Sequence, residues 1–300
     1  MAKTWDQQRE RSNPIMLRLI LWIARRLGRH IARALLLPIV AYFLLTGGSS
    51  KKSSRDFLRR VLDHEPRLAD FTRHFHAFAS VMLDRMLLLS GNPIKLDIQM
   101  QQPPEVAAAM RSGKGCLLLL AHFGSFEVLR ARAPGQSDLR VRVLMDMALN
   151  PAFSQLIQQL NPAFAKSVID ASQRGPVVVL ALKDALSEGA VVGTMADRVR
   201  DDERAVNVEF LGDSARLPAG PWIMASVLNV PVILAFSIYR GGNRYDVQFE
   251  LMADKVELPR ANRDQALQDY AQQYADRLAH HARLAPYNWF NFYDYWRKAS

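Results

Sequence analysis

The sequence predicts an α/β protein in which a mixed, mostly parallel sheet is flanked by helices, with an amphipathic or membrane-associated helix at the N-terminus. Two observations carry this prediction. From about residue 104 onward, short apolar segments alternate with helical patterns, an alternation typical of layered α/β folds. In addition, residues 1–60 hold 13 Lys and Arg against 3 Asp and Glu, while positive and negative side chains balance in the rest of the chain.

Six short apolar segments are expected to form the strands of the sheet. Each is rich in Val, Leu, Ile or Phe and is bounded by turn-forming residues or by a helical pattern. The adjacent glycines within residues 240–244 predict a hairpin turn between the last two segments. The six segments are residues 116–121, 139–145, 190–195, 206–210, 232–239 and 245–251.

Helices are expected between these strands and on either side of them. In residues 66–90, apolar side chains such as Leu68, Phe71 and Phe75 recur at steps of three and four, which predicts one long helix. A last helix is expected over residues 263–284, where apolar residues show the same spacing. The other predicted helices start near Pro104, Ser125, Pro151, Pro176 and Pro218.

Residues 14–45 combine apolar side chains with five arginines. The arginines divide the segment into short apolar blocks, so none reaches the ~20 residues of a clean transmembrane helix. Arginine at this density readily extends its charged end to lipid headgroups, so we expect the segment to associate with a membrane surface rich in anionic lipid. A core helix of a soluble protein is the alternative. The arginines are Arg18, Arg25, Arg26, Arg29 and Arg33.

These patterns divide the chain into a basic, membrane-associating helical segment, residues 1–60, and an α/β domain, residues 61–300. Cys116 is the only cysteine, which excludes an intrachain disulfide and any zinc site built on several cysteines. Two pairs of histidines lack metal-ligand spacing: His74 with His76, and His280 with His281. We therefore expect these histidines to be solvated or half-buried. We expect neither a metal nor a cofactor. Because the basic excess does not lie on the folded domain, nucleic acid is not expected as a partner.

The sharpest local signal lies where the predicted strand 116–121 runs into His122, a turn at Gly124 and an acid, Glu127, at the start of a helix. Reactive groups of open α/β sheets gather beyond the carboxyl ends of strands. Glu127 can turn back and accept one imidazole N–H, which leaves the other nitrogen of His122 as a base near neutral pH. Backbone N–H groups at Gly124 or at the helix N-terminus can stabilise an oxyanion. On spacing alone, a structural histidine and an ordinary first-turn acid explain the pattern equally well.

The string HFGSFE at residues 122–127 resembles the first motif of the glycerolipid and lipid A acyltransferases, in which four residues separate a histidine from an acid. The resemblance implies that His122 is the general base and that Glu127 orients it. Residues 189–198 look like the family's second signature strand, which commonly ends in Asp-Gln and here ends in Asp197 and Arg198.

Other segments resemble particular branches of this family or depart from it. Residues 210–221 are similar to the Phe-Phe-Gly block of the late lipid A acyltransferases, and a basic N-terminal membrane helix is also usual there. The family's Arg-Pro block is missing, because residues 143–147 occupy that region with another sequence. The aromatic tail, residues 286–296, looks most like the branch found with aryl-polyene pigment clusters. We expect this tail to pack as a C-terminal lid, with an interfacial belt or a wall for an acyl chain as alternatives.

The resemblance implies a membrane-associated acyltransferase on the cytoplasmic face of a bacterial inner membrane. A fatty or aryl-polyene acyl group would pass from a thioester of acyl carrier protein or coenzyme A to a hydroxyl or amine of a lipid or glycolipid acceptor. No nucleophile is placed beside His122, so direct attack without a covalent acyl-enzyme is expected.

The remaining site residues are expected to bind substrate, and two other classes of function stay open. Both donors are anionic, and cationic side chains near the strand ends suit them, although these arginines can equally be surface ion-pair partners. The first competing class is a membrane-bound lipid carrier that keeps the fold as a binding module, and the second is a hydrolase that activates water on a thioester. The residues expected to bind substrate are Gly124, Ser125, Asp197, Arg198 and Arg216.

Overall fold

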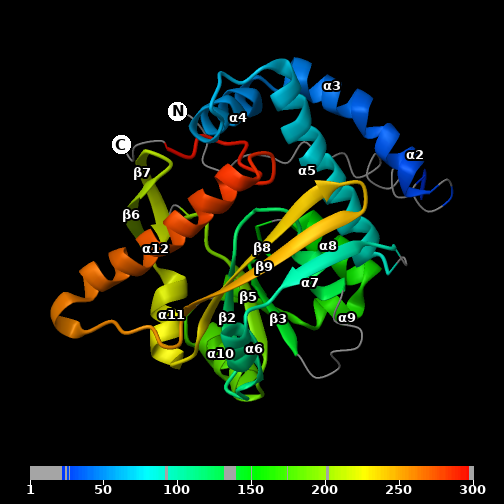
Figure 1. The fold of residues 1–300 in the computed structure, drawn as a ribbon. Helices are drawn as coiled ribbons and strands as arrows, with labels where there is room; N and C mark the ends of the chain where they lie inside the picture. The colour runs from blue at the N-terminus through cyan, green and yellow to red at the C-terminus, as the bar shows by residue number, and fades with distance from the viewer. Residues whose placement is uncertain are drawn as a thin grey trace.

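The computed structural model describes residues 22–23, 26, 28–91, 94–131, 140–149, 151–173, 175–200 and 203–296. Residues 14–21, the first part of the predicted membrane segment, lie outside the described residues. A seven-stranded sheet forms the centre of the molecule, and the N-terminal helices run across one end of it (Figure 1). The α/β prediction is therefore confirmed.

The strands of the sheet follow the order β1-β9-β8-β2-β5-β3-β4. The five from β8 to β4 run parallel to their neighbours, whereas β9 is antiparallel to β8 and pairs in parallel with β1. This confirms a mixed, mostly parallel sheet. The strands are β1 (Asp97–Gln101), β2 (Cys116–Leu120), β3 (Val141–Met145), β4 (Val168–Asp170), β5 (Val191–Met195), β8 (Val232–Gly241) and β9 (Arg244–Ala253).

Helices cover both faces of this sheet, because the fully buried strand β2 sends alternate side chains into two separate cores. Leu117 and Leu119 lie in one core and Leu118 and Leu120 in the other. On the first side pack α10 (Pro176–Ser187), α11 (Gly220–Leu228) and α12 (Arg263–Leu284). On the second side pack α5 (Leu68–Leu89), α6 (Pro104–Arg111), α7 (Phe126–Ala131), α8 (Pro151–Leu160) and α9 (Pro162–Ala165).

The structure contains three strands that the sequence did not predict, two of them at the edges of the sheet. β1 buries one of its five residues and β4 has only three residues, so neither carries the apolar run of a central strand. The third, β7 (Asp213–Pro218), pairs with β6 (Ala205–Phe210) in a separate hairpin whose turn is Leu211 and Gly212, both with positive φ. The hairpin expected at residues 240–244 is confirmed.

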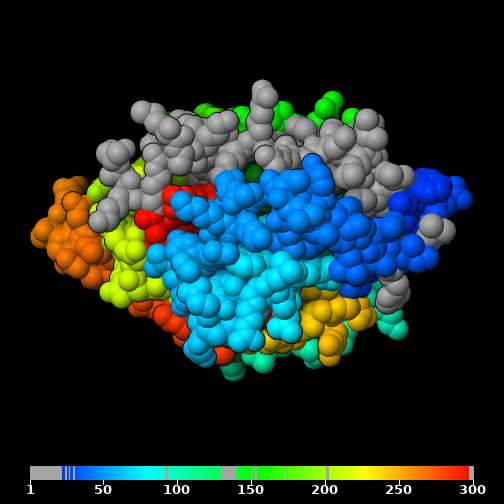
Figure 2. Space-filling view, turned by 90° about the horizontal axis from the view of Figure 1, so that it is seen from above, coloured from blue at the N-terminus to red at the C-terminus, as the bar shows by residue number. Residues whose placement is uncertain are grey.

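From residue 28 to residue 61 the N-terminal segment forms α2 (Arg29–Ala34), α3 (Leu36–Thr46) and α4 (Gly48–Val61). Together with α5 they cover the end of the molecule seen in Figure 2. In α3, Leu36 and Val40 are buried, whereas Leu37, Tyr42 and Leu45 are exposed.

Among the described residues, no single helix has the length and apolar composition of a membrane span. One bent pair, Ile31–Thr46 with Gly48–Val61 at 95°, meets that test of length and composition. The N-terminal membrane helix and the division of the chain at residue 60 stay predictions.

A buried carboxylate fixes α2 against the domain. Asp84 of α5 is fully buried and pairs with both Arg29 and Arg33 of α2. Arg29 Nε lies 2.6 Å from Asp84 Oδ1, and Arg33 donates to Oδ2 at 2.9 Å. The hydroxyl of Tyr245 on β9 donates to the same Oδ2 at 2.7 Å. One carboxylate therefore joins α2, α5 and the sheet.

Replacing Asp84 with Ala should lower the free energy of unfolding by about 3 kcal/mol, because it leaves two largely buried arginines without their counterion. Chemical unfolding followed by circular dichroism measures this change. Glu188→Ala is the matched control, since it breaks the solvent-exposed ion pair with Arg140 and should change stability little. Equal losses in the two variants would contradict the stabilising role of the Asp84 cluster.

Candidate active site

The register of two parallel strands brings His122 and Asp197 together. β2 and β5 pair with Leu120 opposite Met195, and each strand is followed by an alanine and then by one of these polar residues. His122 and Asp197 therefore lie at the same level beyond the carboxyl ends of adjacent strands, where the sites of open α/β sheets form.

The two side chains form a hydrogen-bonded pair. His122 Nδ1 lies 2.8 Å from Asp197 Oδ1, and the backbone N–H of His122 donates to Oδ2 at 3.0 Å. Asp197 is fully buried, whereas the His122 side chain is 32% exposed. An ionised carboxylate only accepts hydrogen bonds, so Nδ1 carries the hydrogen and Nε2 of the neutral ring is left with a free lone pair.

Electrostatics favour the neutral form of His122 and the ionised form of Asp197. Burial and the charge of Arg198 lower the pKa of His122 below its ordinary value, although Asp197 opposes them. Burial alone would raise the pKa of Asp197, but the charge and hydrogen bonds of His122 hold it below its usual range. At neutral pH the pair therefore consists of a free base and a carboxylate that can stabilise its protonated form.

Glu127 lies elsewhere than the sequence suggested. Its buried carboxylate forms an ion pair with Arg85 of α5, with Arg85 Nε 2.6 Å from Oε1, and accepts the Ser125 hydroxyl at Oε2 at 3.0 Å. The imidazole N–H expected to bond Glu127 is instead bonded to Asp197. The reason is that α7 packs against α5, where a cation balances the buried acid.

Gly124 is required where the His122 loop lies against the backbone of β8, and the C-terminal segment pairs with the same loop. Its φ is +64°, and a Cβ here would lie 1.5 Å from the carbonyl oxygen of Ser237. The Gly124 N–H donates to the carbonyl of Asn288 at 3.0 Å, and the Phe290 N–H donates to that of His122 at 2.8 Å. The Gly124 N–H is thus already bonded, which differs from the expectation that it stabilises an oxyanion.

The two arginines assigned to substrate binding are placed differently. Arg198 follows Asp197, donates to the carbonyl of Phe290 at 2.8 Å and lies over the ring of Tyr293. Arg216 is exposed on β7, opposite Asn207 in the hairpin, and forms no hydrogen bond or ion pair with His122 or Asp197. The structure thus brings His122 and Asp197 together, turns the Glu127 side chain toward Arg85, and leaves Arg216 apart from them.

The sequence prediction missed Arg85 and the aromatic residues that contact Asp197. The indole Nε1–H of Trp289 donates to Asp197 Oδ2 at 2.9 Å, and the hydroxyl of Tyr295 donates to the Asp197 carbonyl at 2.9 Å. The aromatic tail packs as predicted, with Trp289, Phe290 and Trp296 buried. The density of aromatic residues in the tail was the available signal, but it did not indicate this contact.

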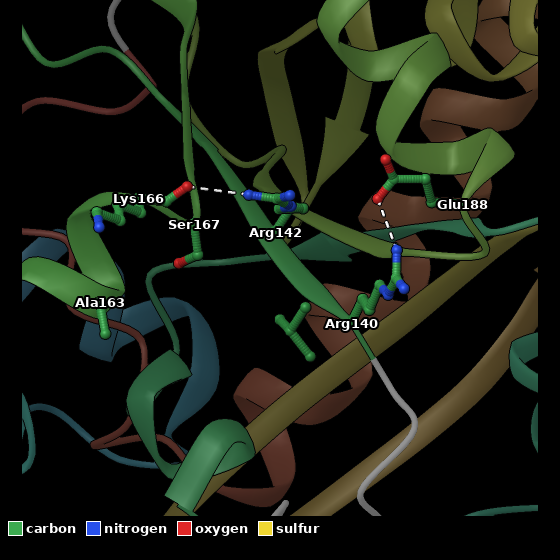
Figure 3. A pocket seen from close by; sticks show the side chains of 7 residues that line it. Arg140, Arg142, Ala163, Lys166, Ser167 and Glu188 are labelled. Atoms are coloured by element: carbon green, nitrogen blue, oxygen red, sulfur yellow. Dashed lines mark hydrogen bonds and ion pairs between the residues drawn. The ribbon is translucent and has the colours of Figure 1, made fainter.

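An open pocket of about 300 Å³ is lined by residues that include Arg140, Arg142 and Glu188 (Figure 3). It surrounds the start of β3, which runs in the same direction as β2, so it lies far from the carboxyl end of β2. Arg140 pairs there with Glu188 at 2.8 Å, and Arg142 donates to the carbonyl of Lys166 at 2.9 Å. The pocket is separate from the His122 site.

The described residues also contain no group of three or more His, Cys, Asp and Glu side chains that could hold a metal ion. The histidine predictions need correction, because His74 and His281 are fully buried rather than solvated or half-buried. His74 Nε2 donates to the Trp289 carbonyl at 3.0 Å, and Nδ1 accepts the Ser54 hydroxyl at 2.9 Å. Both ring nitrogens are therefore satisfied inside the protein.

The stability of the fold should fall as the pH is lowered from 6.5 toward 4. Burial lowers the pKa of His74 from 6.5 to about 4, although its bond to Trp289 opposes this. In the unfolded chain His74 takes up a proton below pH 6.5, whereas in the folded chain it does so only near pH 4. The free energy of unfolding therefore falls by on the order of 3 kcal/mol across this window. Chemical unfolding at a series of pH values should show a shallower dependence for His74→Gln, whereas the same change at exposed His280 should preserve it.

Comparison with known proteins gives the family. A sequence model described as bacterial lipid A biosynthesis acyltransferase matches residues 15–298, nearly the whole chain. No curated protein sequence matches it. The chain therefore belongs to the bacterial lipid A biosynthesis acyltransferases and is an acyltransferase that acts on an acyl donor and a lipid acceptor.

Proposed function

We propose that the protein transfers an acyl group from a thioester of acyl carrier protein or coenzyme A to a hydroxyl or amine of a lipid or glycolipid acceptor, with His122 as general base. The observation that carries this proposal is the pairing of a partly exposed imidazole with a buried carboxylate at the carboxyl ends of β2 and β5. Because the aromatic tail resembles that of the aryl-polyene branch, an aryl-polyene acyl group is proposed beside a fatty acyl group as the group transferred.

In the proposed reaction, Nε2 of His122 takes the proton from the acceptor hydroxyl or amine as its oxygen or nitrogen attacks the thioester carbonyl. Asp197 stabilises the imidazolium that forms. The tetrahedral intermediate then collapses, the carbon–sulfur bond breaks, and the imidazolium returns its proton to the thiolate. Direct attack is supported because neither of the candidate nucleophiles closest to His122 in sequence suits that role. The Ser125 hydroxyl is bonded to Glu127, and burial raises the pKa of the Cys116 thiol to about 12.

The other site residues are proposed to bind and position the substrates. Glu127 holds Arg85 near His122 and, with Ser125, fixes the start of α7. Arg85 and Arg198 both place positive charge close enough to His122 to affect its pKa, which suits an anionic donor. Substrate contacts by Gly124 and Arg216 are kept in the proposal on sequence grounds alone.

The N-terminal helices are proposed to contact the cytoplasmic face of a bacterial inner membrane. Leu37, Tyr42 and Leu45 of α3 are 53%, 60% and 87% exposed, so this helix offers apolar side chains to a bilayer. Lys51 and Lys52 follow in α4 and can bind anionic headgroups. Members of the family are typically membrane-associated, which agrees with this placement.

The test is acyl transfer from a labelled pool of acyl thioesters to a total lipid extract, catalysed by the wild-type membrane fraction. If the proposal is correct, label appears in a lipid product, and the identity of that product gives the acceptor. Membranes that lack the protein serve as the blank for activity from other enzymes, and membranes with the His122→Ala protein test the proposed general base.

Two outcomes would replace the proposal. Release of free fatty acid without any labelled lipid would indicate a thioester hydrolase. Binding of the acyl thioester or lipid without turnover, unchanged by His122→Ala, would indicate a lipid carrier with the same fold.

A further inference from the structure

Trp289 lies at the centre of an aromatic cluster beside the proposed catalytic pair. Only 1% of its surface is exposed. Four other rings surround it at centroid distances of 4.9 to 6.1 Å. They belong to Phe57, Phe210, Tyr295 and Trp296.

The Asp197 carboxylate accepts hydrogen bonds from two N–H groups of His122 and from the indole N–H of Trp289. Oδ1 is bonded to the imidazole at 2.8 Å. Oδ2 is shared between the His122 amide at 3.0 Å and the indole Nε1–H at 2.9 Å. A carboxylate rotates easily about its terminal bond, so the partner of Oδ2 also decides where Oδ1 points.

We propose that Trp289 is a positioning residue of this acyltransferase: its indole N–H fixes Oδ2 of Asp197 and thereby aims Oδ1 at Nδ1 of His122. This inference rests on the proposed role of His122 as the base. Tyr295 supports it by fixing the backbone of Asp197 through the bond from its hydroxyl to the Asp197 carbonyl.

Trp289 can do this because its own backbone is held on both sides. Its carbonyl accepts the Nε2–H of His74 at 3.0 Å, so α5 fixes its position. The next residue, Phe290, donates its N–H to the His122 carbonyl, and Trp289 pairs with Phe123 in an antiparallel bridge. The indole therefore moves with the His122 loop and keeps its direction relative to the carboxylate.

The test compares Trp289→Phe with Trp296→Phe. Each variant loses one indole hydrogen bond from the same cluster, since Trp296 Nε1 donates to the Phe210 carbonyl at 3.0 Å, but only Trp289 contacts Asp197. Trp289→Phe should lower kcat roughly tenfold or more with KM within about twofold, as expected for the loss of a hydrogen bond to a charged group. Trp296→Phe should keep kcat near the wild-type value.

The pH profile gives a readout that a purely structural role would not change. Without the indole N–H, Oδ1 of Asp197 no longer points steadily at Nδ1, so the carboxylate stabilises the imidazolium of His122 less. The rising limb of kcat/KM should therefore move to lower pH in Trp289→Phe and stay in place in Trp296→Phe. On an Asp197→Ala background, Trp289→Phe should lower kcat no further, because its effect passes through that carboxylate.

Equal losses of kcat and unchanged pH profiles in the two tryptophan variants would overturn the inference. If Trp289→Phe shows no cooperative thermal transition, Tyr295→Phe takes its place: a lower kcat with a shifted limb supports the inference, and wild-type kinetics overturn it. Should His122→Ala keep full transfer activity, the proposed function fails. Should His122→Ala abolish transfer while Trp289→Phe behaves as wild type, only this inference fails.

Discussion

Replacing His122 with Ala should lower the rate of acyl transfer by about 10²-fold or more, which is the usual contribution of a general base. The acceptor hydroxyl or amine would then have to lose its proton to water while it attacks the thioester. The His122 side chain is partly exposed and its partner Asp197 is buried, so the change removes the exposed member of the pair and leaves the buried one. The initial rate of labelled lipid formation at saturating donor measures the effect.

His280→Ala is the matched control for this change. His280 is an exposed histidine on α12 and should be replaceable without loss of activity. Circular dichroism and the melting temperature should show that both proteins are folded. If His122→Ala retains more than about a tenth of the wild-type rate, general-base catalysis by this residue is excluded.

The sequence predicted the position of His122 because that position depends on local signals. An uninterrupted apolar run ends at Ala121. Gly124, three residues further on, accommodates a positive φ that a side chain would not tolerate. Strand, turn and helix follow within a dozen residues, so the loop at the strand end could be placed without knowledge of the fold. The same holds for the central strands, whose apolar runs are visible in the sequence.

The partner of His122 could not be predicted in the same way. Asp197 lies 75 residues further along the chain, and its contact depends on β2 and β5 being neighbours in the sheet with Leu120 opposite Met195. Strand order and register are tertiary properties that a single strand does not encode. The shared pattern of apolar residue, alanine and polar residue after each strand is informative only once the two strands are known to be adjacent.

Sequence proximity was misleading for Glu127 for a related reason. The five-residue spacing allows its carboxylate to approach His122, but the packing of α7 against α5 offers it Arg85 instead. A buried acid is stabilised far more by an adjacent guanidinium than by a neutral imidazole. The cation that decides its position lies in a distant helix, and helical periodicity does not reveal which residue it faces.

Asn in place of Asp197 should lower kcat by roughly 10²–10³-fold, a larger loss than Gln in place of Glu127 should cause. The Asn amide keeps the size of the carboxylate but removes the charge that stabilises the imidazolium. It also has one acceptor oxygen for three N–H donors, so its own NH₂ group must face one of them. The ring of His122 is then free to adopt the other tautomer, in which Nε2 carries the hydrogen and cannot act as a base.

The comparison with Glu127→Gln separates the two candidate partners of the base. Gln keeps a bond to Ser125 and loses only the ion pair with Arg85, so we expect a loss of about tenfold or less. Steady-state kinetics of both variants, with ¹⁵N chemical shifts of the imidazole to report its tautomer, measure the difference. If Glu127→Gln proves the more damaging change and Asp197→Asn keeps the wild-type tautomer, then Glu127 moves onto His122 during turnover. In that case Asp197 serves mainly to hold the loop through its bond to the His122 backbone.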